Sequence, residues 1–444
     1  MKKTLLSALL LLAMAFAMLA GCAPSGGQPS NPPADKTDAP AQSAAPGGAA
    51  EELEFYHGYY HDESEWPAAK VMRDIYDEFA AAHAGGPVTF KPIAVENRDD
   101  IVSAQVAGGS YPDVVDLGST IPQAAISQGL ILDLKPFIDE NGLKDAVGLN
   151  YTQNNVDGHI YTVHDQVETR GLWYNAALLE QAGSSVEELS TWAGYASAME
   201  KVRALNNGSY GYVAGQGSVR MMFALLASTA EGRAVLDADF GADVINSQAF
   251  ADAFKQIAAL DQANGSAYTT ADLGNLMADF NQNGIVAVLA NGVWNASGIS
   301  AELAGDIQPT IFPEGVAMAT AGTGLTVSSG MSEAKTELAL EFVKYMTSAE
   351  VQVKIFTGVQ ANPCNTTLDL NAMAKESGDE ILMKLADACD QANHADIIVS
   401  DLWYKWGGDV SNSIINALME CAVSGADIDG RFEQLQKELL ALIG

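Results

Sequence analysis

The stretch Tyr111-Pro-Asp-Val-Val-Asp-Leu117 decides the fold class of this chain, because it predicts a short strand that follows two similar ones. The earlier strands are expected at Glu52-Leu-Glu-Phe-Tyr56, where polar and apolar residues alternate, and at residues 88–95. Helices are predicted between the strands, the first opened by Pro67 and the second at about residues 99–107. Strands that alternate with helices predict a parallel sheet with helices on its faces.

Two loops of this predicted sheet are candidates for ligand contact. Ligands of parallel sheets bind beyond the carboxyl ends of the strands. The loop after the first strand, residues 57–66, and the loop Gly118-Ser119-Thr120 after the third strand therefore share one expected binding rim. The first loop also gathers rings that could contact a ligand, namely Tyr59, Tyr60, His61 and Trp66.

Further motifs follow one another along the chain. They are Tyr111-Pro-Asp-Val-Val-Asp-Leu117, Gln128-Gly-Leu-Ile-Leu-Asp-Leu134, Asp157-Gly-His-Ile-Tyr161, Arg170-Gly-Leu-Trp-Tyr-Asn175 and Asn291-Gly-Val-Trp294. The first two resemble the first lobe of the extracellular solute-binding proteins of carbohydrate ABC importers. The next two resemble the crossing of that family into its second lobe. The last is similar to the family's Asn-Gly-Pro-Trp turn, with valine in place of proline.

The resemblance covers essentially the whole chain after residue 50, and Thr191-Trp192 resembles the start of the helix that usually follows the crossing. It implies an α/β, two-lobed, periplasmic-binding-protein-like fold of type II, with a ligand cleft between the lobes and closure by a hinge. Crossings are expected near residues 164–168, near Ser300 and in the 350s. The expected boundaries are 51–165 for lobe 1, 166–300 for lobe 2, 301–350 for the return to lobe 1, and 351–444 for lobe 2 with the C-terminal helices.

The start of the chain is typical of an exported lipoprotein. Lys2 and Lys3 precede an apolar run that is shorter than the roughly 20 residues of a spanning helix. The run ends at Leu19-Ala20-Gly21-Cys22, which resembles a bacterial lipoprotein signal in which the cysteine thiol is lipidated. We therefore expect residues 1–21 to be a signal peptide and Cys22 to carry acyl groups such as palmitate. Residues 22–50, rich in Pro, Gly, Ser and Ala, are expected to form a disordered linker.

The charge of the chain excludes some partners. Asp and Glu number 56 against 23 Lys and Arg, which gives a formal net charge of -33. This charge repels nucleic acid and anionic lipid head groups. Nucleic-acid binding is therefore excluded, as is membrane contact beyond the lipid anchor.

The cysteines that follow Cys22 indicate neither a metal site nor a full set of disulfides. They are Cys364, Cys389 and Cys421, and an odd number in an exported protein leaves a free thiol or a link to another chain. Cys389 and Cys421 lie in helical apolar patterns and are interpreted as small buried hydrophobes. Their spacing does not match zinc ligands, and no cofactor is expected.

Catalytic motifs are absent from the sequence: there is no GxSxG, HExxH, P-loop or CxxC pattern. His61 and the acidic residues after it could imitate a metal or acid–base cluster, and are interpreted as a polar loop at the rim. A glycosidase pair of Glu168 with Asp62 or Asp165 stays open, because the sequence does not give the distance between carboxylates. The family resemblance argues against an enzyme.

Sugar recognition requires carboxylates or amides for the hydroxyls and aromatic rings for the apolar sugar faces. The family pattern favours the cleft for Trp294 and for the Trp403/Trp406 pair, whereas Trp173 fits a core or the cleft equally well. Glu168 occupies a place in the crossing segment where family members commonly keep a ligand-facing carboxylate. The expected ligand-binding residues are Tyr60, His61, Ser119, Thr120, Glu168, Trp294, Trp403 and Trp406.

The resemblance implies a function as a substrate-binding protein. We expect a monomer, lipid-anchored on the extracytoplasmic face of the cell membrane, that captures a mono- or oligosaccharide and delivers it to the permease of an ABC transporter. One alternative is the same fold with a polyamine or sugar phosphate as cargo, although Arg220 and Arg233 lie outside any phosphate-cradling glycine loop. The other alternative is a surface glycosidase.

Overall fold

The computed structural model describes residues 51–443, except for residues 65, 119–120, 271–272 and 402–404. The predicted signal peptide and linker, and with them Cys22, lie outside the described residues. Three of the expected ligand-binding residues, Ser119, Thr120 and Trp403, also fall in the gaps. Within the described part, no helix combines the length and the apolar character needed to cross a membrane.

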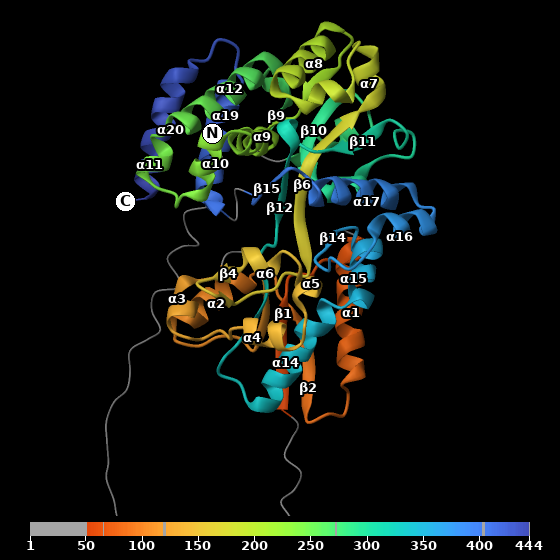
Figure 1. Ribbon diagram of the computed structural model, residues 1–444, viewed down its shortest axis with the longest axis vertical. Helices are drawn as coiled ribbons and strands as arrows, with labels where there is room; N and C mark the ends of the chain where they lie inside the picture. Colours follow the sequence, from red (N-terminus) through yellow and green to blue (C-terminus); the bar gives the residue numbers. More distant parts are fainter. Residues whose placement is uncertain (1–50, 65, 119–120, 271–272, 402–404, 444) are drawn as a thin grey trace, which may run out of the picture. The chain divides into compact units, whose positions relative to one another are not determined.

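The predicted parallel strands form one sheet, in the order β13-β3-β1-β2. β1 (Glu51–His57) runs parallel to β2 (Val88–Ala94) and to β3 (Val114–Leu117), which confirms the expectation for this part of the chain. β13 (Gly324–Val327) joins the edge antiparallel to β3. We call this sheet and its helices the first lobe (Figure 1).

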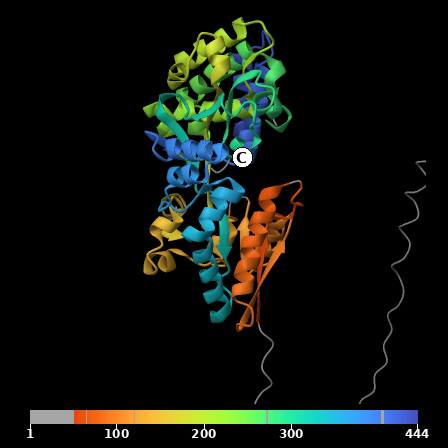
Figure 2. The same cartoon turned by 90° about the vertical axis from the view of Figure 1, so that its right-hand side faces the viewer.

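Helices cover both faces of the first sheet, because neighbouring residues of each strand point into different apolar cores. The covering helices are α1 (Pro67–Ala82), α2 (Arg98–Ala107) and α14 (Glu333–Met346). Phe55 of β1 packs with α1 and α14, whose Phe79 and Phe342 rings lie 5.0 Å apart. The orange α1 and the cyan α14 run beside each other in Figure 2. Val115 of β3 points the other way, into a smaller core with α2. Pro67 is the first residue of α1, as its fixed φ favours.

A second sheet has β6 (Gln166–Asn175) at its centre, in the order β15-β12-β6-β10-β7. β6 is antiparallel to β10 and β12 and also pairs with the short strands β11 and β14 (Figure 1). The other strands are β7 (Tyr210–Tyr212), β10 (Val286–Gly292), β11 (Ile307–Thr310), β12 (Val316–Thr320), β14 (Asn362–Pro363) and β15 (Ile397–Val399). We call this sheet and its helices the second lobe.

Helices of the second lobe build its two apolar cores around the sheet. Thr191 caps α8, its Oγ1 accepting from the Gly194 N–H at 3.1 Å, so the predicted helix start at Thr191-Trp192 is confirmed. These helices are α7 (Ala176–Gln181), α8 (Trp192–Ala204), α9 (Gln216–Ala227), α10 (Ala230–Asp237), α12 (Gln248–Asn264), α16 (Leu370–Ser377), α17 (Glu380–Asn393), α19 (Gly408–Cys421) and α20 (Ile428–Leu442).

Short elements connect these units. The short α-helices are α3 (Gln123–Ser127), α4 (Lys135–Glu140), α5 (Lys144–Val147), α6 (Asn150–Gln153), α11 (Ala242–Ile245), α13 (Met277–Asn281) and α15 (Ala349–Lys354). The short strands β4 (Asn155–Val156) and β5 (His159–Ile160) form an antiparallel hairpin, and β8 (Ala214–Gly215) pairs in parallel with β9 (Thr269–Thr270). Other helical turns lie at η1 (Val186–Ser190), η2 (Ser266–Tyr268), η3 (Leu273–Asn275), η4 (Val293–Gly298), η5 (Pro313–Gly315) and η6 (Ile355–Val359).

The chain passes between the lobes at positions that partly differ from the expected boundaries. Val163 still bridges to Leu325 of the first sheet, and β6 then enters the second. The return does not occur near Ser300, because β11 and β12 pair with β6 and keep residues 301–320 in the second lobe. Residues 351–355 belong to the first lobe, since Val351 and Ile355 pack in its core. The boundaries at 300 and 350 are therefore corrected.

The three cysteines of the described chain are free and buried. Cys389 and Cys421 lie in the apolar cores of the second lobe, which confirms their interpretation as small hydrophobes. Burial raises the pKa of the Cys364 thiol well above its ordinary value, which disfavours the reactive thiolate.

Candidate functional site

β6 presents two different faces, because successive side chains of a strand point to opposite sides of the sheet. Gln166, Glu168 and Arg170 share one face, and Val167 and Thr169 share the other. The antiparallel partner β12 follows the same division, since its Thr320 lies opposite Glu168 and its Ala319 opposite Thr169. The two faces border different cavities, which can be compared for their fitness to bind a sugar.

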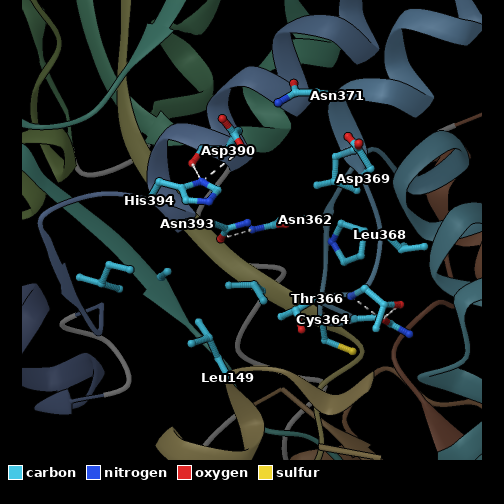
Figure 3. Close-up of a pocket in the computed structure, with 17 residues that line it drawn as sticks. Leu149, Asn362, Cys364, Thr366, Leu368, Asp369, Asn371, Asp390, Asn393 and His394 are labelled. Atoms are coloured by element: carbon cyan, nitrogen blue, oxygen red, sulfur yellow. Dashed lines mark hydrogen bonds and ion pairs between the residues drawn. The ribbon is translucent and has the colours of Figure 1, made fainter. Parts of the chain in front are cut away.

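The face with Val167 borders the pocket in Figure 3, which has a volume of about 540 Å³. Its polar groups are largely paired with one another. The Asn362 Nδ2 donates to the Thr169 Oγ1 at 2.8 Å, and the His394 Nδ1 lies 3.2 Å from a carboxylate oxygen of Asp390. Among the described residues that line it there is no Phe, Tyr or Trp. Without such a ring this pocket lacks the stacking surface that a pyranose requires.

The opposite side of the crossing strands borders a second cavity of about 420 Å³, lined by both lobes. Thr320, the neighbour of Glu168 across the sheet, contributes to its wall. Ile121 of the first lobe and Lys405 of the second also line it, directly beside the undescribed residues 119–120 and 402–404. The expected ligand residue Glu168 therefore lies on this side of the crossing and not on the side of the pocket of Figure 3.

Glu168 projects from β6 and belongs to a network of charges. Its Oε2 lies 3.3 Å from the Arg170 Nη2, and the Arg170 Nε lies 3.0 Å from the Asp401 Oδ2. Exposure decreases through the network, from 25% of the Glu168 side chain to 9% for Arg170 and 1% for Asp401. Glu168 is thus the most exposed member of the network, and its contact with a ligand stays a prediction.

Trp294 lies beside this network on the turn after β10, and 37% of the residue is exposed. Its ring centroid is 5.0 Å from the Arg170 guanidinium carbon, a cation–π distance. The indole rests directly on Gly292, because a Cβ at that position would overlap the ring. A hydrogen bond of 3.0 Å from the Trp173 Nε1 to the Gly292 carbonyl holds the turn. Trp294 therefore offers a supported and accessible platform.

The buried Arg220 also supports this turn, through the last residues of β10. Its Nη1 donates to the Ala290 carbonyl at 2.8 Å and to the Asn291 Oδ1 at 3.3 Å. Burial first, and then the nearby charge of Arg170, lower the pKa of Arg220 to about 9. Two guanidinium groups thus lie close together, which makes the carboxylates of Glu168 and Asp401 necessary counter-charges.

The loop after β1 contributes a cluster of rings from the first lobe. Tyr60 is 41% exposed and stacks on His61, with ring centroids 4.3 Å apart. Tyr59 stacks on Trp66 at 5.1 Å. Arg73 of α1 holds the loop, because its Nη1 donates to the carbonyls of Tyr59 and His61 at 2.8 and 2.7 Å.

The ring cluster reaches the crossing strand through Tyr59. The Gln166 Nε2 donates to the Tyr59 hydroxyl at 3.2 Å. Burial, with the charges of Asp165 and Asp116 next, raises the pKa of that hydroxyl well above its ordinary value, so it stays neutral. Two side chains on the same face of β6 therefore make different contacts. Gln166 contacts the rings of the first lobe, and Arg170 contacts the Trp294 platform.

Acidic groups gather at the first crossing. Burial and the charge of Asp165 raise the pKa of Asp116 to about 6. Burial lowers the pKa of His164, but the charges of Asp165, Glu168 and Asp116 outweigh it, so the net shift is upward. In the described part of the chain, no group of three or more His, Cys, Asp and Glu side chains could hold a metal ion.

The prediction that Trp406 binds the ligand in the cleft is wrong. It lies in a core of the second lobe with only 7% of its surface exposed. The rings of Phe223, Phe240 and Phe250 surround it at centroid distances of 4.7, 5.1 and 5.9 Å. With its faces occupied by these rings, it cannot serve as the sugar platform that was expected. Trp173, for which core and cleft were both open, is also buried in a core.

Four of the eight expected residues, Tyr60, His61, Glu168 and Trp294, are described and at least partly exposed, and their contact with a ligand stays a prediction. The supporting roles of Arg170, Asp401 and Gly292 were not among the expectations from the sequence. The signal for Arg170 was available, because an arginine directly before the apolar run Gly171-Leu-Trp-Tyr174 of a buried strand needs a partner for its charge. The role of Gly292 could not be predicted, because its contact with the indole depends on the rotamer of Trp294.

Comparison with known proteins gives a family match over most of the chain. A family model described as "Bacterial extracellular solute-binding protein" matches residues 74–379. A Streptococcus pneumoniae solute-binding protein, solved in complex with the blood group A-trisaccharide, is 44% identical, with 88% of this chain and 100% of that chain covered and a TM-score of 0.78. A chitin oligosaccharide binding protein is 20% identical, with 87% and 98% covered and a TM-score of 0.67, and shows the likeness of fold alone.

One curated relative matches over a shorter region. The arabinooligosaccharide-binding protein of Bacillus subtilis (strain 168) is 28% identical over 126 residues, which cover 26% of this chain and 27% of the relative. The match therefore spans about a quarter of that protein. The two-lobed solved structures confirm the predicted fold class, and the family model covers more than half of the residues. The chain belongs to the bacterial extracellular solute-binding proteins.

Proposed function

We propose that this protein captures a carbohydrate outside the cytoplasm and delivers it to an ABC importer. The observation that carries the proposal is the exposed Trp294 platform beside Glu168, on the side of the crossing strand that adjoins a cavity lined by both lobes. The 44% identical solute-binding protein in complex with the blood group A-trisaccharide supports a saccharide as the ligand.

The chemistry of the site suits a sugar. A flat indole matches the apolar face of a pyranose, and a carboxylate accepts from two adjacent hydroxyls at once. Stacking on Trp294 should contribute on the order of 1–3 kcal/mol. Tyr60 and His61, from the first lobe, supply a further ring surface and polar atoms. A ligand held by groups of both lobes favours the closed state by the contacts that only closure completes.

A thermal-shift panel followed by calorimetry tests the proposal. The panel contains the blood group A-trisaccharide, raffinose, maltose, chitin oligosaccharides and arabino-oligosaccharides, with spermidine and glucose 6-phosphate as the competing cargo classes. A ligand at 100 times its Kd should stabilise the protein by roughly 2.7 kcal/mol. Stabilisation by a saccharide supports the proposal, whereas stabilisation by spermidine or the sugar phosphate alone contradicts it. Turnover of a chromogenic glycoside would favour the surface glycosidase instead.

The proposal includes a lipid anchor at Cys22, which rests on the signal ending in Leu19-Ala20-Gly21-Cys22. A lipidated N-terminus would keep the binder next to the importer on the extracytoplasmic face of the membrane. Cells expressing Cys22→Ser should release the protein from the membrane fraction or accumulate its unprocessed form. If the variant stays as membrane-bound and as fully processed as the parent, the anchor is not at this residue.

A further inference from the structure

Arg170 connects three parts of the candidate site that are far apart in the sequence. Its guanidinium contacts Glu168 on its own strand, Asp401 beyond β15, and the Trp294 ring on the turn after β10. The side chain is only 9% exposed. A buried guanidinium is stable only when its charge is paired, so its position depends on these partners.

Asp401 is placed to orient Arg170 and not to touch a ligand. Its side chain is 1% exposed, and its backbone N–H donates to the Thr320 Oγ1 at 2.7 Å. Because the carboxylate is enclosed, its influence on a bound sugar must pass through the groups around it. Arg170 is a cation in that position, with its Nε 3.0 Å from the Asp401 Oδ2.

Four charged groups of the described chain influence one another at this site: Arg170, Arg220, Glu168 and Asp401. Arg170 and Arg220 are both buried, and Arg220 hydrogen bonds to the uncharged Ala290 carbonyl and Asn291 side chain. Glu168 and Asp401 supply the two negative charges. Removing Asp401 therefore leaves Arg170 with one carboxylate, and the guanidinium should shift toward Glu168 and away from its position under the indole.

We infer that Arg170 is the positioning residue of the cleft, held by Asp401 and in turn holding Glu168 and Trp294 in the arrangement that receives the sugar. The inference rests on the proposed function, because it assigns the ligand contacts to Glu168 and Trp294. The inference makes Asp401 a determinant of the affinity for the sugar, although Asp401 does not itself contact the ligand.

The first test needs no ligand. The fluorescence of Trp294 is isolated as the difference between each protein and the same protein carrying Trp294→Phe. Asp401→Asn should change the Trp294 emission in the parent background and leave it unchanged in the Arg170→Met background. The exposed Asp237→Asn is the matched control and should have no effect in either. An Asp401→Asn effect that persists without Arg170, or no effect in the parent, overturns the inference.

The second test measures coupling in binding, with the blood group A-trisaccharide as the probe. Glu168→Gln, Asp401→Asn and the double variant should show non-additive losses of affinity, with a coupling of about twofold or more. The coupling should vanish with Arg170→Met. If that variant does not fold, Arg170→Lys replaces it, since lysine keeps the charge but cannot hold two carboxylates in a fork. Additive losses overturn the inference while the proposed function stands. Absence of binding by the parent to any saccharide of the panel overturns the proposed function, and the fluorescence test then decides the inference alone.

Discussion

Gly292→Ala should weaken saccharide binding by displacing Trp294. Gly292 has φ −75° and ψ 169°, values that alanine adopts without strain. The new Cβ would instead overlap the indole, which rests on this glycine. The ring must move, and its 5.0 Å contact with the Arg170 guanidinium must change with it. The backbone tolerates the substitution, so the main effect falls on the platform.

The expected loss of binding free energy follows from the exposed part of the Trp294 ring. A tryptophan has on the order of 250 Å² to bury, so 37% exposure leaves about 90 Å² for a ligand. At ~25 cal/mol per Å² that surface contributes about 2 kcal/mol, which corresponds to some thirtyfold in Kd at ~1.4 kcal/mol per decade. Gly292→Ala should therefore approach the loss caused by Trp294→Ala.

Calorimetry with the best saccharide of the panel provides the assay, and chemical unfolding checks that each variant is folded. Gly305→Ala is the matched control, because a Cβ there meets nothing within 4 Å. The combined Gly292→Ala/Trp294→Ala variant should bind no worse than Trp294→Ala alone, since the glycine acts through the ring. Parent-like affinity of a folded Gly292→Ala protein would refute the assignment of Trp294 as the platform. An additive loss in the double variant would refute the mechanism.

Three further predictions concern stability and closure. Trp406→Ala should lower the free energy of unfolding by about 3–5 kcal/mol, since it empties a core site, and leave the Kd of the folded fraction unchanged; urea unfolding and calorimetry measure the two effects. Burial raises the pKa of Asp261 to about 7, so the folded state binds the proton more tightly than the unfolded chain. The stability from that proton should be lost as pH rises from about 4 through 7, and unfolding titrations at several pH values should show a flatter profile for Asp261→Asn. X-ray scattering should show a small contraction on saturation with the saccharide, and an unchanged envelope would contradict hinge closure.

The first lobe could be predicted from the sequence because its signals are local. Polar and apolar residues alternate in β1, and Pro67 with the helical spacing of Met72, Ile75 and Phe79 identifies α1. Parallel pairing then follows from the alternation of strands and helices. These patterns do not require knowledge of any distant contact.

The second crossing could not be located in the same way. Val316-Ala-Met-Ala-Thr320 is apolar enough for a buried strand of either sheet, and its pattern does not name a partner. Pairing with β6 and β15 decides the question, and both partners lie far away in the sequence. The error for Trp406 has the same origin, because a tryptophan near a predicted cleft looks the same in the sequence whether its ring faces solvent or, as here, Phe223 and Phe250.

The placement of ligand groups on the crossing strand bears on how closure would be driven. Glu168 lies on β6 itself, and Trp294 lies on a turn held to β6 through Arg170 and Gly292, so both keep their relation when the lobes rotate. Tyr60 and His61 belong to the first lobe and change their distance from Trp294. A sugar that docks first on Trp294 and Glu168 therefore makes these contacts equally in the open and the closed state. Contacts of equal strength in both states do not shift the equilibrium between them. We therefore expect closure to be driven by groups of the first lobe, such as the loop that Arg73 holds in place.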